Sequence, residues 1–417
     1  MFANNIEKSI LRLSSPIYQI DNLFRAEDYD WPGDWEGRAL LAFCRLYSIT
    51  GKKIPAMDEM VALLPQKTNS DGFFGAKFDV CAVDEQQLSG HSWYLRGLVA
   101  YAELFPQSAA MDYARKTVHN LFIPALKQYE NYPIERGEDA SGGVSGNLNG
   151  KIGNWRLSTD VGCAFIPLDG LAHYYSNSRD EELKPLLEAA IEKFLSLDKV
   201  SLKMQTHATL TAARGVLKYY EATADKKYLT YVIDTFRLYI QCGMTATYEN
   251  YNWFGRSHEE IWTEPCAVVD SMILALELYR LTGEENYKKL ARRIWFNGLQ
   301  YCQRVNGGAG PNSCVDANRP MLKTGMYEAP FCCTMRYAEG LYWFDKNRDL
   351  LTWNDGEPVK EDDRYFINDW LLVEDTEGVF SGNKTYATDS GELILLPGGQ
   401  NIPEEKASDI RLKVIFR

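Results

Sequence analysis

The sequence of 417 residues lacks the features that mark secreted, membrane-spanning and nucleic-acid-binding proteins. No stretch approaches the roughly 20 apolar residues of a membrane-spanning helix. The first segment, MFANNIEKSILRLSSPIYQIDNLF, lacks the apolar centre of a signal peptide. Acidic residues outnumber basic ones by 57 to 45, and the resulting net charge of −12 repels phosphate backbones. We therefore expect a protein that binds neither nucleic acid nor a membrane.

Cysteine is sparse as well. Nine cysteines, an odd number spread along a long chain, do not form the framework of a disulfide-stabilised scaffold. Free thiols are typical of a reducing compartment, so we expect a cytoplasmic protein, or a periplasmic one if a leader has been removed. Hydrophobic residues make up 45% of the chain, which is ample material for one large domain with an appendage, or for two domains.

The chain does contain a repeated helical unit. Each copy is an apolar stripe with a spacing near 3.6, a short polar break and a second stripe, which together predict a helical hairpin. With a further hairpin beginning near Cys332, about six pairs are expected, and such pairs must stack or close on one another. We predict a mainly α fold, an (α/α)6 toroid of helical hairpins over residues 1–345. The five copies span residues 41–64, 97–122, 170–195, 215–240 and 274–299.

The pattern changes to period two after about residue 346. Segments such as RYFINDWLLVE and GELILLPGG read as strands separated by Asp and Gly turns. Residues 346–417 are therefore expected to form a small C-terminal β appendage, an incomplete β-sandwich.

Two short clusters carry residues that can ligate a metal. Glu264 and Cys266 precede one apolar helix, and the adjacent Cys332 and Cys333 precede another. One carboxylate and three thiols match the donor set of a tetrahedral zinc site, although the spacing is not that of a zinc finger. The residues alone leave other interpretations open: Cys266 as a buried apolar residue, Glu264 as a helix cap, and the cysteine pair as a disulfide or an accident.

These segments resemble glycoside hydrolase family 127, the β-L-arabinofuranosidase family, whose members have an (α/α)6 barrel followed by β-sandwich domains. The resemblance implies a retaining hydrolase that releases a terminal furanose-type sugar from an oligosaccharide or plant-glycan-derived substrate. It also implies one Zn²⁺ bound by Glu264, Cys266, Cys332 and Cys333, with Cys332 as the nucleophile. The matching segments are GDWEGRALLAFCRLYSITG, SGHSWYLRGLVAYAEL, QTHATLTAARGVLKYYEATADKKYL, TEPC and FCCTMRYAEG, in family order.

A retaining glycosidase also needs a proton donor near the leaving oxygen. Glu249 lies between aromatic residues in the segment before Glu264, and it is our candidate for the acid/base. In the family this glutamate lies one residue further upstream, and Glu259 and Glu260 are alternatives here.

The resemblance further implies that His91 and His207 bind the sugar, although a histidine at the head of an apolar helix is often purely structural. The chain departs from the family pattern at Arg292 and in the Gly-rich loop 303–314, which leaves the identity of the sugar open.

Two other functions remain as alternatives. One is a non-catalytic α/α carbohydrate-binding or scaffold protein with a structural zinc. The other is a zinc-dependent prenyltransferase-like subunit, which needs a histidine ligand late in the chain, and no histidine follows His258. The oligomeric state is also open, a homodimer being one alternative.

Overall fold

The computed structural model describes residues 2–79, 81–136, 148–255, 262–324, 327–398 and 410–416. Glu259 and Glu260, the alternative acids, lie outside the described residues. The chain folds into two compact units. Residues 13–242 and 253–255 form the first, here called the helical unit, and residues 1–12, 243–252 and 256–417 form the second, here called the terminal unit. In the described part of the chain no helix is long and apolar enough to cross a membrane.

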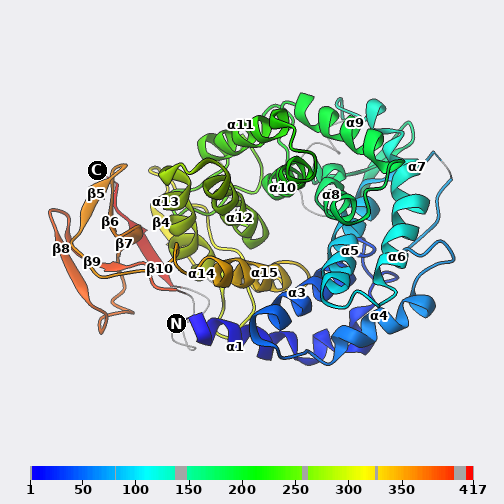
Figure 1. The fold of residues 1–417 in the computed structure, drawn as a ribbon. Helices are drawn as coiled ribbons and strands as arrows, with labels where there is room; N and C mark the ends of the chain where they lie inside the picture. The colour runs from blue at the N-terminus through cyan, green and yellow to red at the C-terminus, as the bar shows by residue number, and fades with distance from the viewer. Residues whose placement is uncertain are drawn as a thin grey trace. The chain divides into compact units, whose positions relative to one another are not determined.

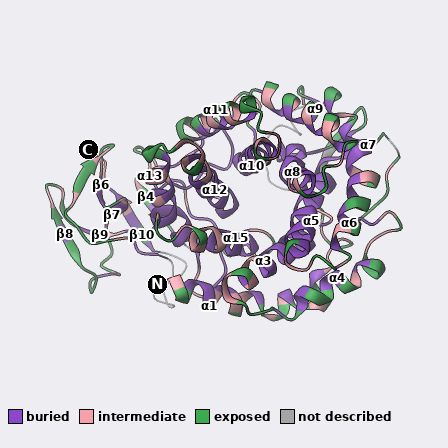
Figure 2. Cartoon of the chain, viewed as in Figure 1, coloured by how far each residue is buried: buried purple, intermediate pink, exposed green. Residues whose placement is uncertain are grey.

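The helical unit contains four of the predicted hairpins. Helix α3 packs on α5, α5 on α8 and α8 on α10, so these four lie side by side (Figure 1). Along α5 every residue from Glu85 to Ala102 is buried (Figure 2). The hairpins are α3 (Asp34–Thr50) with α4 (Ala56–Lys67), α5 (Glu85–Leu104) with α6 (Ala110–Thr117), α8 (Pro167–Ser178) with α9 (Leu183–Ser196), and α10 (Thr206–Thr223) with α11 (Lys226–Cys242).

Short elements connect these hairpins. A small sheet has the order β1-β3-β2, with β1 parallel to β3 and β2 antiparallel to it. The connecting elements are η1 (Pro16–Tyr18), α2 (Ile20–Leu23), β1 (Val83–Asp84), η2 (Val118–Phe122), α7 (Ile123–Leu126), η3 (Tyr129–Asn131), β2 (Leu148–Ile152), β3 (Trp155–Ser158) and η5 (Cys163–Phe165).

The helices of the terminal unit include both ends of the predicted α region. Helix α12 (Pro265–Thr282) is followed by α13 (Glu285–Arg293), η6 (Ile294–Leu299) and α14 (Gln300–Cys302), and α15 (Cys333–Lys346) comes last. Helix α1 (Phe2–Leu13) packs against α15, because Asn5 Nδ2 donates to the Tyr337 hydroxyl at 2.9 Å and the Phe2 and Phe344 rings lie 4.3 Å apart. The partner of α15 therefore comes from the start of the chain, not from residues after it.

The C-terminal strands form an antiparallel sheet in the same unit. The order is β4-β10-β7-β6-β5, with β9 also paired to β7 and β8 paired to β9. Strand β4 lies before residue 346, the predicted start of the β appendage, and the other strands of this sheet lie after it. The strands are β4 (Met321–Lys323), β5 (Val359–Glu361), β6 (Arg364–Ile367), β7 (Trp370–Glu374), β8 (Thr385–Thr388), β9 (Gly391–Leu395) and β10 (Arg411–Val414).

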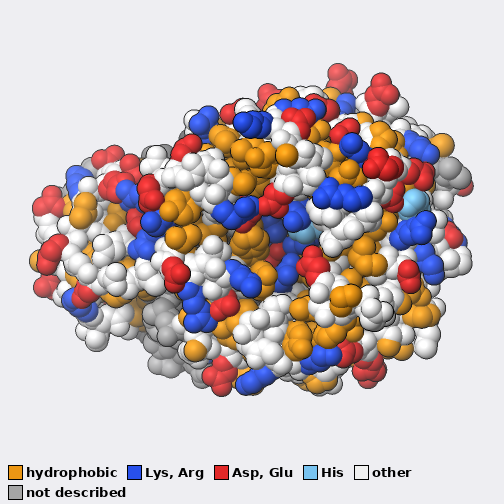
Figure 3. Space-filling model, in the orientation of Figure 1, with side chains coloured by type: hydrophobic (Ala, Val, Ile, Leu, Met, Phe, Trp, Pro, Cys, Tyr) orange, Lys and Arg blue, Asp and Glu red, His pale blue; other side chains and the backbone are white. Residues whose placement is uncertain are grey.

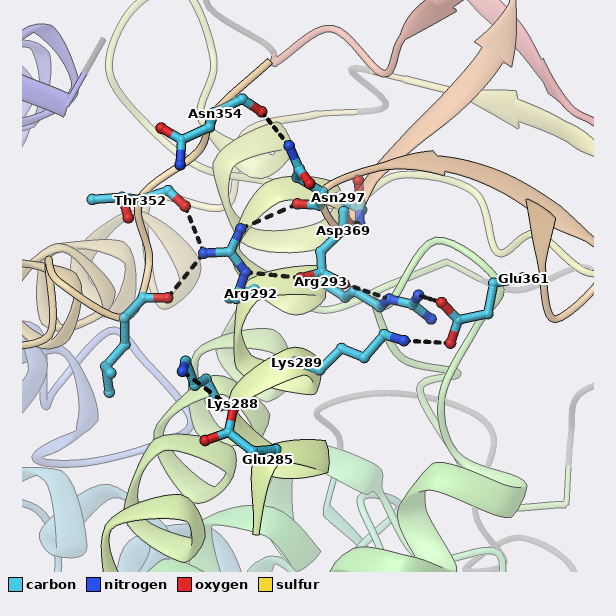
Figure 4. A network of polar contacts seen from close by, with 12 residues as sticks. Glu285, Lys288, Lys289, Arg292, Arg293, Asn297, Thr352, Asn354, Glu361 and Asp369 are labelled. Atoms are coloured by element: carbon cyan, nitrogen blue, oxygen red, sulfur yellow. Dashed lines mark hydrogen bonds and ion pairs between the residues drawn. The ribbon is translucent and has the colours of Figure 1, made fainter. Parts of the chain in front are cut away.

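Arginines at the end of α13 hold this sheet (Figure 4). Arg292 Nε donates to Asp369 Oδ2 at 2.8 Å, and Arg293 Nη2 donates to Glu361 at 2.6 Å. Asn297 Nδ2 adds a bond to the Asp369 carbonyl at 2.9 Å. Arg292, one of the departures from the family pattern, thus has a structural role here. Charged side chains of both signs are otherwise mixed over the face seen in Figure 3.

Candidate metal centre and buried glutamate

Three cysteine sulfurs meet in the terminal unit at the starts of α12 and α15. Cys332 Sγ lies 3.3 Å from Cys333 Sγ, and Cys266 Sγ lies 3.7 Å from Cys333 Sγ. All three sulfurs lie within 4.8 Å of one another, and all three cysteines are free thiols. The structure therefore brings together the two ligand clusters that the sequence holds apart by more than sixty residues.

The backbone at the start of α15 explains how adjacent cysteines share one site. Successive residues of an α-helix point about 100° apart, because a turn takes 3.6 residues. Cys332 is not helical: it precedes the helix with φ −143° and ψ −67°, and Cys333 is the first helical residue. The Arg336 N–H donates to the Cys332 carbonyl at 3.0 Å and fixes this first turn. The break in helical geometry allows both sulfurs to face Cys266.

Glu264 occupies the residue before α12, with Pro265 as the first helical residue. One of its carboxylate oxygens lies within 4.8 Å of Cys266 Sγ. Its backbone N–H donates to Asn250 Oδ1 at 2.8 Å, which orients the residue. Glu264 is the N-cap residue of α12 by position, but its side chain makes no capping hydrogen bond to the helix.

The charges around the sulfurs fit a bound cation. Burial raises the pKa of the Cys333 thiol well above its usual value, and its hydrogen bond with Cys266 and the negative charges of Cys266 and Glu264 raise it further. Such thiols become thiolates when a metal ion supplies the compensating charge. Thiolates with one carboxylate are donors that zinc accepts and that calcium and magnesium do not prefer. The residues present therefore suit a zinc ion.

Glu249 lies in the same unit and is fully buried. Its Oε1 accepts hydrogen bonds from Thr263 Oγ1 at 3.0 Å and from Asn312 Nδ2 at 2.9 Å. Its Oε2 accepts one from Thr247 Oγ1 at 3.0 Å. Burial raises the pKa of Glu249 from 4.5 to about 7, and these neutral donors lower it only in part. Neither the burial nor the three donors could be expected from the sequence around Glu249.

Asn312 belongs to the Gly-rich loop 303–314, which is tightly built. Arg304 Nη1 donates to Asn312 Oδ1 at 3.3 Å and thereby orients the amide that reaches Glu249. The loop also packs closely on the segment that leads to the cysteine pair. A Cβ atom at Gly310 would lie 1.8 Å from the Tyr327 carbonyl oxygen, and one at Gly308 would lie 2.2 Å from Glu328 Oε1. At Gly310, which faces backbone, only glycine fits, whereas at Gly308 a larger residue would require the Glu328 side chain to move.

Two exposed aromatic side chains lie just before the cysteine pair. Tyr327 is 47% exposed and Phe331 is 38% exposed. Burial of part of Tyr327 raises its pKa to about 12, and the negative charges of Cys333, Cys332 and Glu264 also contribute, which places the phenol near the thiols. Aromatic faces of this kind suit contact with sugar rings. Both residues stand just before the Cys332–Cys333 pair in the sequence. The chain contains 25 tyrosines, however, so this position alone did not identify Tyr327 as a candidate for sugar contact.

The predicted sugar-binding histidines lie in the helical unit. His91 is fully buried, its Nε2 accepts from the Phe74 N–H at 2.9 Å, and its Nδ1 donates to the Gln87 carbonyl at 2.7 Å. Burial lowers the pKa of His91 to about 4, so the ring is neutral at physiological pH. His207 stacks on Trp93 with ring centroids 5.8 Å apart. The backbone uses both nitrogens of His91, and a sugar-binding role for either histidine stays a prediction.

No protein-family model matches the sequence, and no curated protein matches it. The fold, however, is shared with solved structures. A family 127 β-arabinofuranosidase is 13% identical with a TM-score of 0.55, over 89% of this chain and 60% of that protein. A family 127 β-L-arabinofuranosidase from Geobacillus stearothermophilus T6 is 12% identical with a TM-score of 0.52, over 90% and 63%. A cellobiose 2-epimerase from Bacillus thermoamylovorans is 16% identical with a TM-score of 0.52, over 83% and 100%.

These comparisons confirm the predicted fold class, which is mainly α with an (α/α)6 toroid and a small C-terminal β region. They also confirm the likeness to family 127 at the level of the fold. The chain spans 60% of the length of the first family 127 structure. The same fold serves hydrolases and epimerases, so a choice of reaction depends on the residues of the site.

Proposed function

We propose that this chain is a retaining glycoside hydrolase that releases a terminal furanose-type sugar, with Cys332 as its nucleophile. One observation carries the proposal: among three clustered sulfurs, that of Cys332 belongs to the partly exposed residue, whereas Cys266 and Cys333 are 0% and 2% exposed. Buried thiols can only hold a metal, but an accessible one can also reach a substrate. The likeness of fold to family 127 β-L-arabinofuranosidases supports the furanose-type sugar.

Glu264, Cys266, Cys332 and Cys333 would hold the zinc ion. When bound, it supplies the positive charge that keeps coordinating thiols deprotonated at neutral pH.

The reaction takes two steps that the side chains can balance. In the first, the Cys332 thiolate attacks the anomeric carbon and forms a C–S bond, while the bond to the leaving oxygen breaks and that oxygen keeps the electron pair. Glu249 gives its proton to the leaving oxygen. In the second, water gives a proton to Glu249 and attacks the anomeric carbon, so the C–S bond breaks and the thiolate returns. Two displacements at one carbon retain its configuration.

The environment of Glu249 favours the acid role. A pKa near 7 keeps the carboxyl protonated below neutral pH, as a proton donor requires. Oε1 accepts from Thr263 and Asn312, and Oε2 accepts from Thr247.

A panel of nitrophenyl furanosides and pyranosides tests the proposal. Cys332→Ser should abolish turnover of every substrate while the protein stays folded, because a serine hydroxyl is not a thiolate. Cys81→Ser, which changes an exposed cysteine of the helical unit, is the matched control and should keep full activity. Glu249→Gln should slow natural glycosides by roughly 10²–10⁴-fold but spare the first step for activated aryl glycosides. Normal activity of Cys332→Ser would rule out the assigned nucleophile.

One observation favours a second function, a carbohydrate-binding or scaffold protein with a structural metal. Glu249 is 0% exposed, and its carboxylate accepts hydrogen bonds from Thr247, Thr263 and Asn312 and from the Cys302 thiol, as in a purely structural group. This function predicts that the protein binds zinc and glycans but hydrolyses no member of the panel. It also predicts that Glu249→Gln leaves glycan binding unchanged.

A further inference from the structure

The sulfur cluster depends on the axial register of two helices. Cys266 is in the first turn of α12 and Cys333 begins α15, and these helices lie side by side (Figure 1). A residue advances an α-helix by about 1.5 Å, whereas metal–ligand distances tolerate about 0.2 Å. A slip of much less than one residue would separate the sulfurs, so something must fix the register.

Apolar packing between the helices supplies close contact but no directional bond. Gly340 of α15 faces Val269 of α12 and Leu299, where an added Cβ atom would lie 3.2 Å and 2.7 Å from their side chains. The contact is close, but hydrophobic burial is in itself non-directional.

A buried ion pair crosses the same interface one turn further along each helix. Arg336 Nη2 donates to Asp270 Oδ1, and the two side chains are 1% and 0% exposed. Asp270 lies four residues after Cys266, and Arg336 lies three after Cys333, so both follow a ligand along the same helix face. A charge-assisted hydrogen bond is directional and therefore fixes both distance and register.

The guanidinium is itself held in place. Glu339, one turn beyond Arg336 on α15, forms an ion pair with Arg336 Nη1, and its own side chain is 1% exposed. The Arg336 N–H, in turn, donates to the Cys332 carbonyl at 3.0 Å. The same residue thus closes the first turn behind the thiol pair and reaches across to α12.

We propose that Asp270 and Arg336 are positioning residues, which set the approach of Cys266 to the cysteine pair and thereby the geometry of the metal centre. The inference rests on the metal centre of the proposed function. It makes no use of the catalytic roles of Cys332 and Glu249.

Cobalt provides the test, because Co²⁺ replaces Zn²⁺ and its thiolate charge-transfer and ligand-field bands report the ligand geometry. Asp270→Asn, nearly equal in shape, should weaken Co²⁺ binding by about 10–100-fold and change the bands. The control is Asp369→Asn, the same chemical change in the arginine network of Figure 4, whose arginines contact none of the four ligands among the described residues. This variant should keep wild-type affinity and bands.

Three results would separate the alternatives. If Asp270→Asn binds Co²⁺ with the affinity and spectrum of the wild type, or if both variants weaken it equally, the pair does not position the ligands. If the wild-type protein shows no thiolate band with Co²⁺, the metal centre of the proposed function is itself wrong. If Asp270→Asn fails to fold by circular dichroism, Arg336→Lys, which keeps the charge but loses the planar fork, is judged by the same criteria.

Discussion

Replacement of Glu249 by glutamine should change how the stability of the protein depends on pH. Burial raises the pKa of this carboxyl from 4.5 to about 7 in the folded protein. Between these values the folded state binds more protons than the unfolded state, so the free energy of unfolding falls as pH rises through that window. A shift of this size corresponds to about 3 kcal/mol. Glutamine cannot ionise, so this fall in the free energy of unfolding does not occur in the variant.

The expected result is a difference in the free energy of unfolding between Glu249→Gln and the wild type that changes with pH. From pH 4.5 to pH 8, Glu249→Gln should gain about 3 kcal/mol relative to the wild type, most of it below pH 7. Urea unfolding at a series of pH values, in reducing buffer with constant zinc, measures this difference. Glu36, whose pKa burial also raises to about 7, contributes equally to both proteins and cancels.

An aspartate with the opposite shift gives the control. The hydrogen bonds and charge of Arg319 outweigh burial and lower the pKa of Asp316, so its contribution to stability is lost only as pH falls below its ordinary value. Asp316→Asn should therefore show a constant difference from the wild type between pH 5 and pH 8. The infrared carbonyl band of protonated carboxyls at pH 6 is a direct check: it should be weaker in Glu249→Gln than in the wild type, because only Glu36 of this pair still contributes to it. A pH-independent difference for Glu249→Gln would refute the raised pKa and, with it, the acid role.

Three further predictions concern the same unit. Protein purified in reducing buffer without added metal should contain about one zinc per chain by elemental analysis, and a metal-free protein with a vicinal disulfide would contradict this. Gly310→Ala places a Cβ 1.8 Å from the Tyr327 oxygen and should lower the free energy of unfolding by about 1–3 kcal/mol, whereas Gly382→Ala, with no atom within 4 Å, should not. Equal melting temperatures would refute that. Asn312→Ala removes a donor that favours ionised Glu249, so the carboxyl band should persist to higher pH, and an unchanged midpoint would contradict the assignment.

The sequence predicted the positions of the helices better than it predicted which elements pack against each other. Periodic apolar stripes are local signals, and all five hairpins that they indicated are present. The packing of α1 on α15 depends on contacts such as that between Asn5 and Tyr337, 332 residues apart, which leave no periodic trace. Strand β4 was not predicted as part of the C-terminal sheet, because a strand of three residues is too short to show an alternating pattern.

The residues of the candidate site also differ in whether a local sequence pattern or a long-range contact identifies them. Glu264, Cys266 and the cysteine pair were identified because ligand-type residues stand together at two helix starts. Thr247, Thr263 and Asn312 are single polar residues in separate segments, and their shared target, Glu249, exists only once the chain has folded. In the sequence, Asp270 and Arg336 resemble ordinary charged residues within helical segments. Their pairing becomes apparent only in the folded protein, where both side chains are buried.

The loop 303–314 shows why a departure from a family pattern needs a structural explanation. Its Gly310 is required by the Tyr327 backbone before the cysteine pair, and its Asn312 supplies one of the donors to Glu249. The loop therefore contacts both Glu249 and the segment that carries the exposed Tyr327. A loop that diverges here can alter which sugar is accepted and how the acid titrates while the metal ligands stay the same. It follows that substrate preference should vary with this loop independently of zinc content, which is why the substrate panel and the metal analysis must be read separately.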